Sequence, residues 1–454
     1  MNIRQMLVLI IASCVCVMAE EFEIKPGFKV IDSVSQFREV MAGSDLKIRM
    51  KPGTYIVKDA LPDNKTVFAF EGSNSYFDMR GVTIQIDTKV LANMRGKVHS
   101  LAVYRVLGDN ITFEGGIFED IGEDAPYTSL SEFSVTGDDA KFLNCKFIIR
   151  GSSPYGYGDM YGKGAGASAN LQKHAALGIS GDRCLVDGCD FSIETFGHGI
   201  HIHGGQDTVI KNVTMLGRLR LTDEIYQEKE GIAAKYDYKI MYPDWIKGQP
   251  IPRGQMLSLT EDGIRAYLEG EDKNGKNRRT GHITVENCKV VKMRGGITVC
   301  MAQSASITNC TVLDSGGHAY SVPSNGIVRD CKGNAAYSPL LSMPYSNKSN
   351  ADIELELVEA ENSMGDHPLA EIVGNGHKIK ISYNAAQKPQ KLRPIIVGTT
   401  GGRYTEGNTA PEELKKNNLA RKIILDNQSP HPVELTVYAV DCQIKSVGKV
   451  SDPQ

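Results

Sequence analysis

Short stretches of alternating apolar and polar residues recur along most of the chain, and glycine, asparagine or aspartate separates them. A period of two residues is typical of β-strands, because successive side chains then point to opposite faces. Helical spacing stands out only near the start, where Ser33 precedes an apolar pattern that ends at Met41. At the far end, residues 422–425 and 433–440 have the composition of strands. The pattern predicts an all-β chain with an N-terminal helical cap and C-terminal cap strands.

One short sequence motif, here called the repeated phrase, recurs along the chain with a cysteine at a fixed position. The cysteine comes three positions after an apolar residue and usually two positions before a second apolar residue. The last three copies are separated by 22 and 21 residues. A period of about 20–50 residues is typical of solenoids and propellers. Because the repeats hold short strands and no helical pattern, they predict a β-solenoid of stacked parallel strands. The five cysteines of the phrase are Cys145, Cys189, Cys288, Cys310 and Cys331.

These cysteines are expected to stack inward as small apolar side chains, one above another. Two alternatives compete with this interpretation. An exported protein often forms disulfides, and cysteines can bind zinc, although no Cys-x-x-Cys pair occurs here.

The spacing of the phrases also predicts the organisation of the chain. Residues 20–100 are expected to form the N-terminal cap and first rungs, residues 101–385 the parallel β-helix, and residues 386–454 the C-terminal rungs and cap strands. Two insertions interrupt the helix, at 151–173 and at 218–255. Long insertions in a compact repeat usually form functional walls or lids.

The first residues of the sequence have the pattern of a targeting signal. Arg4 precedes an apolar stretch, and Ala19 ends a small-x-small pattern, which predicts a signal peptide over residues 1–19. The alternative is a bacterial lipoprotein signal, with the anchor on Cys14. No later stretch reaches about 18 apolar residues, the length of a membrane span. We expect a secreted or periplasmic protein, anchored by lipid if Cys14 is modified.

Composition limits the partners. The 454 residues are 41% hydrophobic and 23% charged, with a net charge of −3, which is ordinary for a globular protein. Without a global basic field, nucleic acid is an unfavourable partner. An acidic ligand would need a local basic patch. We expect a monomer without a cofactor.

Such a patch is predicted on the outer face. Three segments align without gaps, at 199–203, 263–267 and 296–300, and alternation turns their isoleucines inward. His201 and Arg265 then share one outward column, and His203 and Tyr267 share the next. Because neighbouring rungs lie about 4.8 Å apart, cationic and phenolic groups distant in sequence meet on one face.

This patch suits an extended acidic polymer, because Arg and Lys bind carboxylates. On a uronic-acid polysaccharide the expected reaction is β-elimination, which needs a base, an acid and a cation to stabilise enolate-like charge. The residues predicted to catalyse it are Lys173 as base, Tyr157 as acid, and Arg265 with His201 to counter the carboxylate. The residues predicted to bind substrate are Tyr155, Tyr161, Lys163, His174, His198, His203, Tyr267 and Arg294. No metal ligands are expected.

The chain resembles the right-handed parallel β-helix polysaccharide lyases, and in particular family 31, which includes alginate lyases. The motifs that carry this resemblance are Gly151–Asp159, Lys163–Gly164, Lys173–His174, Gly197–Gly199 and Glu261–Tyr267. The resemblance implies a single right-handed parallel β-helix and a catalytic Lys/Tyr pair without an obligatory metal. Lys173 matches the lysine, and the tyrosine is one of Tyr155, Tyr157 and Tyr161.

Two other functions stay open. Gly197–Gly199 resembles a motif of β-helical polygalacturonases, which would make the chain a glycoside hydrolase. Hydrolysis needs two carboxylates across the scissile bond, and Glu261 and Asp262 are the best acids for that role. The other alternative is a polysaccharide-binding or adhesin solenoid without catalysis.

Overall fold

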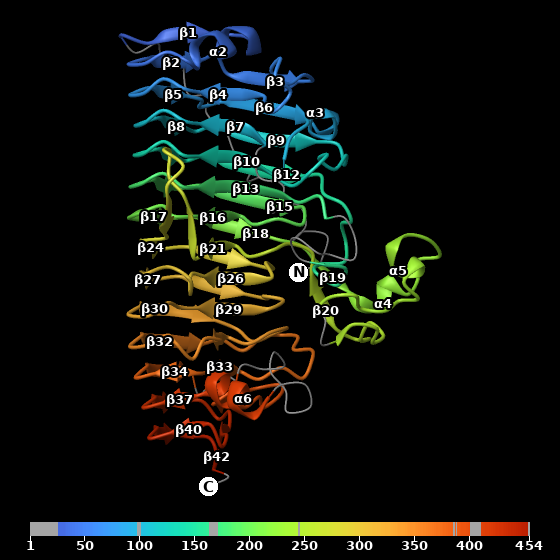
Figure 1. Ribbon diagram of the computed structural model, residues 1–454, viewed down its shortest axis with the longest axis vertical. Helices are drawn as coiled ribbons and strands as arrows, with labels where there is room; N and C mark the ends of the chain where they lie inside the picture. Colours follow the sequence, from blue (N-terminus) through green and yellow to red (C-terminus); the bar gives the residue numbers. More distant parts are fainter. Residues whose placement is uncertain are drawn as a thin grey trace, which may run out of the picture.

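The chain winds into one tall parallel β-helix, whose turns stack from the N-terminal to the C-terminal end (Figure 1). The computed structural model describes residues 26–97, 101–162, 171–243, 246–384, 386, 388–399 and 410–452. The predicted signal peptide, including Cys14, and the predicted site residue Lys163 lie outside these ranges. Among the described residues, no helix has the length and apolar character needed to cross a membrane.

Two faces of the solenoid belong to one 22-stranded sheet, in which the strands of successive turns pair in parallel. Its strands are β1 (Lys29–Ile31), β2 (Lys47–Met50), β3 (Gly53–Val57), β5 (Tyr76–Asp78), β6 (Val82–Asp87), β8 (Thr112–Glu114), β9 (Ile117–Ile121), β11 (Lys141–Leu143), β12 (Lys146–Arg150), β14 (Leu185–Asp187), β15 (Asp190–Glu194), β17 (Thr208–Lys211), β18 (Thr214–Leu216), β24 (His282–Glu286), β25 (Lys289–Val291), β27 (Ser304–Thr308), β28 (Thr311–Leu313), β30 (Ile327–Gly333), β32 (Asp352–Leu357), β35 (Lys378–Tyr383), β38 (Ile424–Asn427) and β41 (Gln443–Ser446).

The third face is a 13-stranded parallel sheet, and it carries the outward columns predicted above. Its strands are β4 (Phe68–Phe70), β7 (Ala102–Val106), β10 (Leu130–Val135), β13 (His174–Ile179), β16 (Ile200–Ile202), β21 (Ile264–Ala266), β26 (Gly295–Thr298), β29 (His318–Ser321), β31 (Leu341–Met343), β33 (Ala370–Ile372), β36 (Ile395–Val397), β39 (Val433–Leu435) and β42 (Val450–Ser451).

The interior is filled by side chains that repeat from turn to turn. The five cysteines of the repeated phrase are all buried and free, which confirms the inward ladder. Phenylalanines stack in the same way, for example Phe147 on Phe191 with ring centroids 4.5 Å apart. Such stacking follows from the register, because each rung places the same inward position above the last.

Glycines form a third ladder, at one corner of the early turns. A side chain added at Gly108, Gly137 or Gly181 would place its Cβ 1.9 Å from the carbonyl oxygen of the glycine one rung before. The absence of a side chain therefore lets the backbone of successive turns approach closely at this corner.

Helix α2 (Val34–Val40) covers the first turn, as predicted, and Ser33 caps it by accepting a hydrogen bond from the Gln36 N–H. Near the other end, α6 (Pro411–Asn418) lies beside the last turns (Figure 1). Helix α3 (Thr88–Asn93) belongs to an early turn. In the late turns, a small three-stranded sheet is formed by β34 (Gly374–Asn375), β37 (Ala420–Arg421) and β40 (Ala439–Val440).

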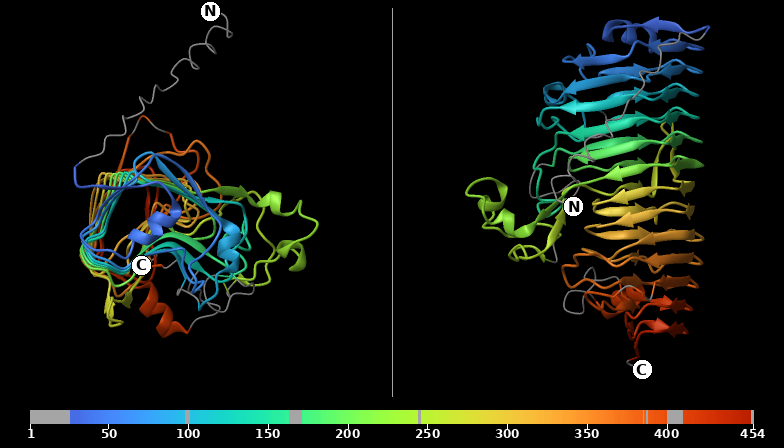
Figure 2. Two further views of the ribbon diagram at one scale, coloured as in Figure 1. Left: turned by 90° about the horizontal axis from the view of Figure 1, so that it is seen from above. Right: turned by 180° about the vertical axis from the view of Figure 1, so that it is seen from behind.

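The insertion at 218–255 forms a lobe that projects from the side of the solenoid (Figure 2). It is entered and left through the antiparallel pair β19 (Leu219–Leu221) and β20 (Met256–Ser258), and it holds α4 (Thr222–Ile225) and α5 (Ile232–Lys235). A small hydrophobic cluster of its own joins this lobe to Met160 and Tyr161 of the earlier insertion.

A second hairpin, β22 (Glu269–Glu271) with β23 (Asn277–Arg279), leaves the solenoid after β21 and runs back along earlier turns (Figure 1). Lys273 at its tip forms ion pairs with Asp109 and Asp138 at 2.9 and 3.0 Å.

Candidate active site

A cavity of about 120 Å³ lies on the outer face of the 13-stranded sheet, over β10, β13, β16 and β21. Charged, imidazole and phenol groups meet in it although up to 94 residues separate them in the sequence. Parallel stacking explains this, since each rung contributes the same outward positions. The cavity is lined by Ser129, Leu130, Ser131, Lys173, Ala175, His198, His201, His203, Glu261 and Tyr267.

The register of the predicted columns is confirmed. His201 of β16 pairs with Arg265 of β21, and with Gly178 of β13 on its other side. A Cβ at Gly178 would approach the His201 ring to 2.6 Å, so the glycine leaves the space in which the imidazole lies. The ring reaches across β13 to the Ser131 hydroxyl of β10, 3.2 Å from Nε2. In the next column, the His203 and Tyr267 rings stack with centroids 4.1 Å apart.

Two of the residues that line the cavity form an ion pair. The Lys173 ammonium lies 2.8 Å from Glu261 Oε1, with side-chain exposures of 16% and 3%. The direct partner of Lys173, the predicted base, is therefore a carboxylate. Burial alone would raise the pKa of Glu261, yet His198, Lys173 and Arg294 outweigh it and lower the pKa to about 2. Glu261 is therefore ionised at neutral pH.

His198 connects this pair to Tyr267. The Asp262 backbone N–H donates to His198 Nδ1 at 3.1 Å, so the proton of the neutral ring is on Nε2. Nε2 lies 2.8 Å from the Tyr267 hydroxyl oxygen and donates to it. Burial lowers the pKa of His198 to about 4 against the opposing charges of Glu261 and Asp262, so the ring is neutral at pH 7. Burial raises the pKa of Tyr267, so its hydroxyl keeps its proton.

Two arginines support the site from its edge. Arg294 lies 3.1 Å from Asp262 Oδ1 and 3.3 Å from Asp159 Oδ2, and Arg265 lies 3.6 Å from Asp262 Oδ2. Asp159 is the point where the insertion at 151–173 meets the site. The guanidinium of Arg265 also lies over the Tyr267 ring, 5.2 Å from its centroid.

The tyrosines of that insertion do not reach the cavity. Tyr157 donates its hydroxyl hydrogen bond to Glu228 Oε2 at 2.6 Å, in the projecting lobe. Tyr161 is 1% exposed and packs in the hydrophobic cluster of the same lobe. Tyr155 lines a separate open cavity of about 690 Å³ with Arg150, Glu194 and Arg218 among other residues. The insertion and the lobe pack against each other, which alternation along single strands does not reveal.

The prediction that His174 binds substrate is not met. Its side chain is fully buried and contacts two buried carboxylates of other strands instead. Alternation breaks locally, because Ala176 and Leu177, which are adjacent in β13, both lie in the hydrophobic core, and Glu132 is buried beside the core residue Phe133 in β10. The column argument has no means of detecting such an irregularity.

Sequence reasoning placed Glu261 only among possible acids of a hydrolase, and it did not single out Ser131. Glu261 lies two residues before the aligned segment at 263–267, so its position beside the columns was a usable signal. Ser131 carried none, because the strand that holds it has no aligned polar column.

No known family profile matches this chain. No curated protein matches it in sequence either. The solved structure of alginate lyase AlyF-OU02 is similar, with 11% identity, a TM-score of 0.47 and coverage of 94% of this chain and 87% of that chain. A mannuronic-acid-specific polysaccharide family 6 lyase from human gut microbiota has 10% identity, a TM-score of 0.46 and coverage of 92% and 82%.

An endo-xylogalacturonan hydrolase from Aspergillus tubingensis is also similar, with 10% identity, a TM-score of 0.39 and coverage of 94% of this chain and 93% of that chain. Lyases and a hydrolase thus stand side by side among the similar structures, and a fold does not decide a reaction. The resemblance to family 31 stays a prediction.

Proposed function

We propose that this chain is a lyase that cleaves an acidic, uronic-acid-containing polysaccharide by β-elimination. One observation carries the proposal. An ammonium group, imidazoles and a phenol that is hydrogen-bonded to a neutral histidine line the same outer cavity of the solenoid. These are the group types that the elimination needs, namely a cation for the carboxylate, a base for the α-proton and an acid for the leaving oxygen.

Tyr267 is the proposed acid. Its oxygen accepts the His198 Nε2–H, so its own O–H proton is available to a substrate atom in the cavity. His201 is the proposed base, since its imidazole lines the same cavity and the unprotonated nitrogen of a neutral imidazole can accept a proton. The predicted acid Tyr157 is not used, because its hydroxyl is engaged by Glu228 outside the cavity.

The elimination then proceeds as follows. His201 removes the proton from C5, and the electron pair of that C–H bond forms the C4–C5 double bond. The bond from C4 to the glycosidic oxygen breaks, and Tyr267 protonates the departing oxygen. Proton transfer from the imidazolium of His201 to the phenolate of Tyr267, whose ring centroids are 6.4 Å apart, restores both groups.

Lys173 is the proposed cation. Its ammonium lies 2.8 Å from Glu261 at the cavity, and a positive charge there suits a group that neutralises a carboxylate and stabilises the enolate-like charge. The same pair disfavours the predicted role of Lys173 as base, because a base must first lose its proton.

The open cavity beside Tyr155 is the proposed continuation of the polymer site. Arg150 and Arg218 line it, and its Ser152 accepts a hydrogen bond from the Phe196 N–H. The Phe196 ring lies against the Lys173 ammonium, 5.2 Å from its centroid, which links the two cavities through one residue.

A hydrolase is not favoured by this geometry. Glu261 and Asp262, the acids named for it, have 3% side-chain exposure each and form ion pairs with Lys173 and the two arginines. Glu261 and Asp262 therefore do not form the pair of carboxylates that hydrolysis needs on the two sides of a glycosidic bond.

The test is to incubate the purified chain with separate uronic-acid polymers, among them alginate and polygalacturonate, and to follow ultraviolet absorbance and reducing ends together. A lyase yields an unsaturated product that absorbs as reducing ends appear. Reducing ends without absorbance would indicate hydrolysis and overturn the proposal. Binding of a polymer without either signal would overturn it in favour of a binding solenoid.

A further inference from the structure

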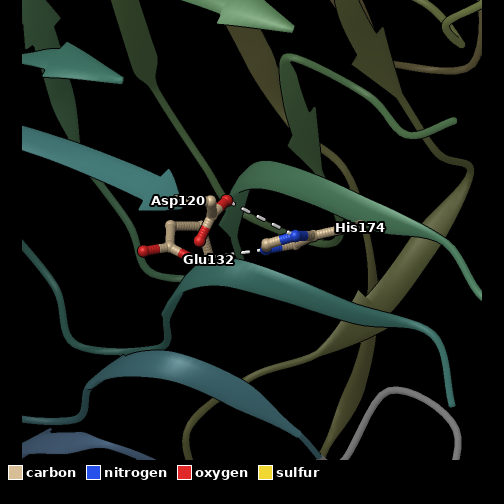
Figure 3. A group of neighbouring side chains, drawn as sticks. All are labelled: Asp120, Glu132 and His174. Atoms are coloured by element: carbon tan, nitrogen blue, oxygen red, sulfur yellow. Dashed lines mark hydrogen bonds and ion pairs between the residues drawn. The ribbon is translucent and has the colours of Figure 1, made fainter. Parts of the chain in front are cut away.

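A second polar cluster lies inside the solenoid, directly behind the cavity. Asp120 lies in β9, Glu132 lies in β10 and His174 begins β13, and all three side chains are fully buried (Figure 3). One ligand atom from each lies within 4.8 Å of the other two. Nothing in the proposed elimination uses these groups, since they face the interior and the substrate lies outside.

The backbone of Arg150 orients two of them. Its N–H donates to Asp120 Oδ2 at 2.9 Å, and its carbonyl oxygen lies 2.8 Å from His174 Nδ1. A carbonyl only accepts, so His174 carries a proton on Nδ1, and in the neutral ring Nε2 presents a lone pair. Histidines that bind metals commonly hold their other ring nitrogen in this way, with its N–H on a backbone carbonyl or a carboxylate.

That lone pair faces another acceptor. His174 Nε2 lies 3.2 Å from Glu132 Oε2, and an ionised carboxylate has no proton to donate. A proton on either group would satisfy this one contact. It would still leave Asp120 Oδ1 and Glu132 Oε1, which are buried and have no hydrogen-bond partner among the described residues.

Charge compensation is also missing. In the described part of the chain, neither carboxylate forms an ion pair with lysine or arginine, and the guanidinium of Arg150 is directed to Glu119 and Glu194. Two carboxylates therefore lie in the interior with no fixed cation, which is costly unless a bound ion neutralises them.

We propose that Asp120, Glu132 and His174 bind one divalent transition-metal ion, of the zinc or manganese type, inside the solenoid. Two carboxylates and one imidazole form a mixed oxygen and nitrogen donor set that suits these ions better than calcium or magnesium, which prefer oxygen alone. The separation of His174 Nε2 and Glu132 Oε2 agrees with two ligands of one tetrahedral ion, which stand about 3.3 Å apart when each bond is about 2.0–2.2 Å.

The ion would join three consecutive turns immediately beneath Lys173, the residue that precedes His174. It therefore contributes to the stability of the fold at the floor of the cavity and takes no part in the proposed chemistry. Because all three ligands are fully buried, exchange with a chelator requires local opening. We expect slow loss of the ion from the folded protein and rapid loss after unfolding.

The experiment uses the full chain, purified in metal-free buffer, and measures its bound metals by mass spectrometry after dialysis. We expect one zinc or manganese ion per chain. Protein unfolded and refolded with a chelator, then freed of it, should gain thermal stability when Zn²⁺ or Mn²⁺ is added, because an ion that binds only the folded state stabilises it. Ca²⁺ should give a much smaller gain.

Asp120→Asn and Glu132→Gln keep the side-chain shape and should weaken metal affinity by more than tenfold. The matched control is Glu371→Gln in β33, a strand of the 13-stranded sheet that also holds β10 and β13. Burial raises the pKa of the Glu371 carboxyl to about 7, and this carboxyl has no histidine partner among the described residues. The Glu371→Gln variant should retain the ion. If wild-type protein holds no ion and none of the three metals raises its thermal midpoint, the cluster is a proton-sharing network and the proposal is wrong. Stabilisation by Ca²⁺ alone would also overturn it. Both results come from the wild type, so a variant that fails to fold does not obscure the outcome.

Discussion

Tyr157 and Tyr267 differ in what their hydroxyl groups contact. The Tyr267 hydroxyl accepts from His198 in the cavity, and the Tyr157 hydroxyl donates to Glu228 in the lobe. Tyr267→Phe should therefore lower kcat by about 10²–10⁴-fold, the usual contribution of an acid or base, with a smaller change in KM. Tyr157→Phe is the matched control and should leave kcat within the same order of magnitude. Steady-state kinetics on a polymer that the wild type cleaves would measure both, and a reversed result would return the acid to Tyr157.

Two substitutions of Lys173 distinguish its proposed role as the cation from its predicted role as the base. Lys173→Ala should lower kcat/KM whichever role it has. Lys173→Arg separates the roles, because a guanidinium keeps the positive charge but does not deprotonate in proteins. We expect kcat/KM of the arginine variant to be at least tenfold higher than that of the alanine variant. An arginine variant as inactive as the alanine variant would restore Lys173 as the base.

Glu261 makes the stability of the protein depend on pH. Its pKa is lowered in the folded state to about 2, below the ordinary value of 4.5, so the unfolded chain binds a proton first as the pH falls. The stabilisation is fully present above pH 4.5 and is lost between about pH 4.5 and 2. The shift corresponds to a contribution on the order of 3 kcal/mol. Urea unfolding at pH 6 and pH 3 should show the free-energy difference between wild type and Glu261→Gln shrinking at the lower pH; a constant difference would contradict it.

At this scale, sequence reasoning succeeded where alternation was regular. His201 and Arg265 are adjacent because their strands align without a gap, and that register follows from inward isoleucines. It failed for His174, where Ala176 and Leu177 of β13 both lie in the hydrophobic core and break the period. It also failed for Tyr157, because the contact of one insertion with another depends on tertiary packing that no local pattern encodes.

At the scale of elements, the repeated phrase predicted strands, turns and stacking together, and the Ser33 cap predicted the helix that covers the first turn. The paths of the insertions were not predictable in the same way. The hairpin of β22 and β23 follows β21 directly, yet its Lys273 contacts aspartates more than 130 residues earlier in the chain. Surface pairs of this kind contribute little energy, so they leave little trace in composition.

The glycine ladder gives a prediction for these elements. A methyl group at Gly137 would lie 1.9 Å from the Gly108 carbonyl oxygen, which belongs to the backbone and has no rotamer to change. Gly137→Ala should lower the free energy of unfolding by about 3 kcal/mol, the upper part of the range for overpacking. Gly275→Ala is the control, since no atom lies within 4 Å of its added Cβ. Its positive φ of 75° should cost only about 1 kcal/mol. Urea unfolding curves compare the two, and equal losses would show that the ladder tolerates a side chain.

At the scale of the whole molecule, stability comes from a continuous core and not from covalent links between turns. The interior side chains of each rung pack on those of the next, and the eight described cysteines are free, seven of them buried. This arrangement lets a chain of this length fold without the disulfides that small secreted domains need. The stacked core also explains why one face can carry reactive groups from distant segments, since the other positions of each rung are committed to packing.

The state of the thiols tests this view of the molecule. A chain that begins after residue 19 lacks Cys14 and Cys16 and keeps eight cysteines. A thiol reagent must reach the sulfur atom, and seven of the eight thiols are buried. We therefore expect at most one fast-reacting thiol in the native protein, the half-buried Cys442, and eight after denaturation without a reductant. A reductant should leave the thermal midpoint unchanged. If fewer than eight thiols appear after denaturation, or if the reductant lowers the midpoint, disulfides join the turns and the inward cysteine ladder is wrong.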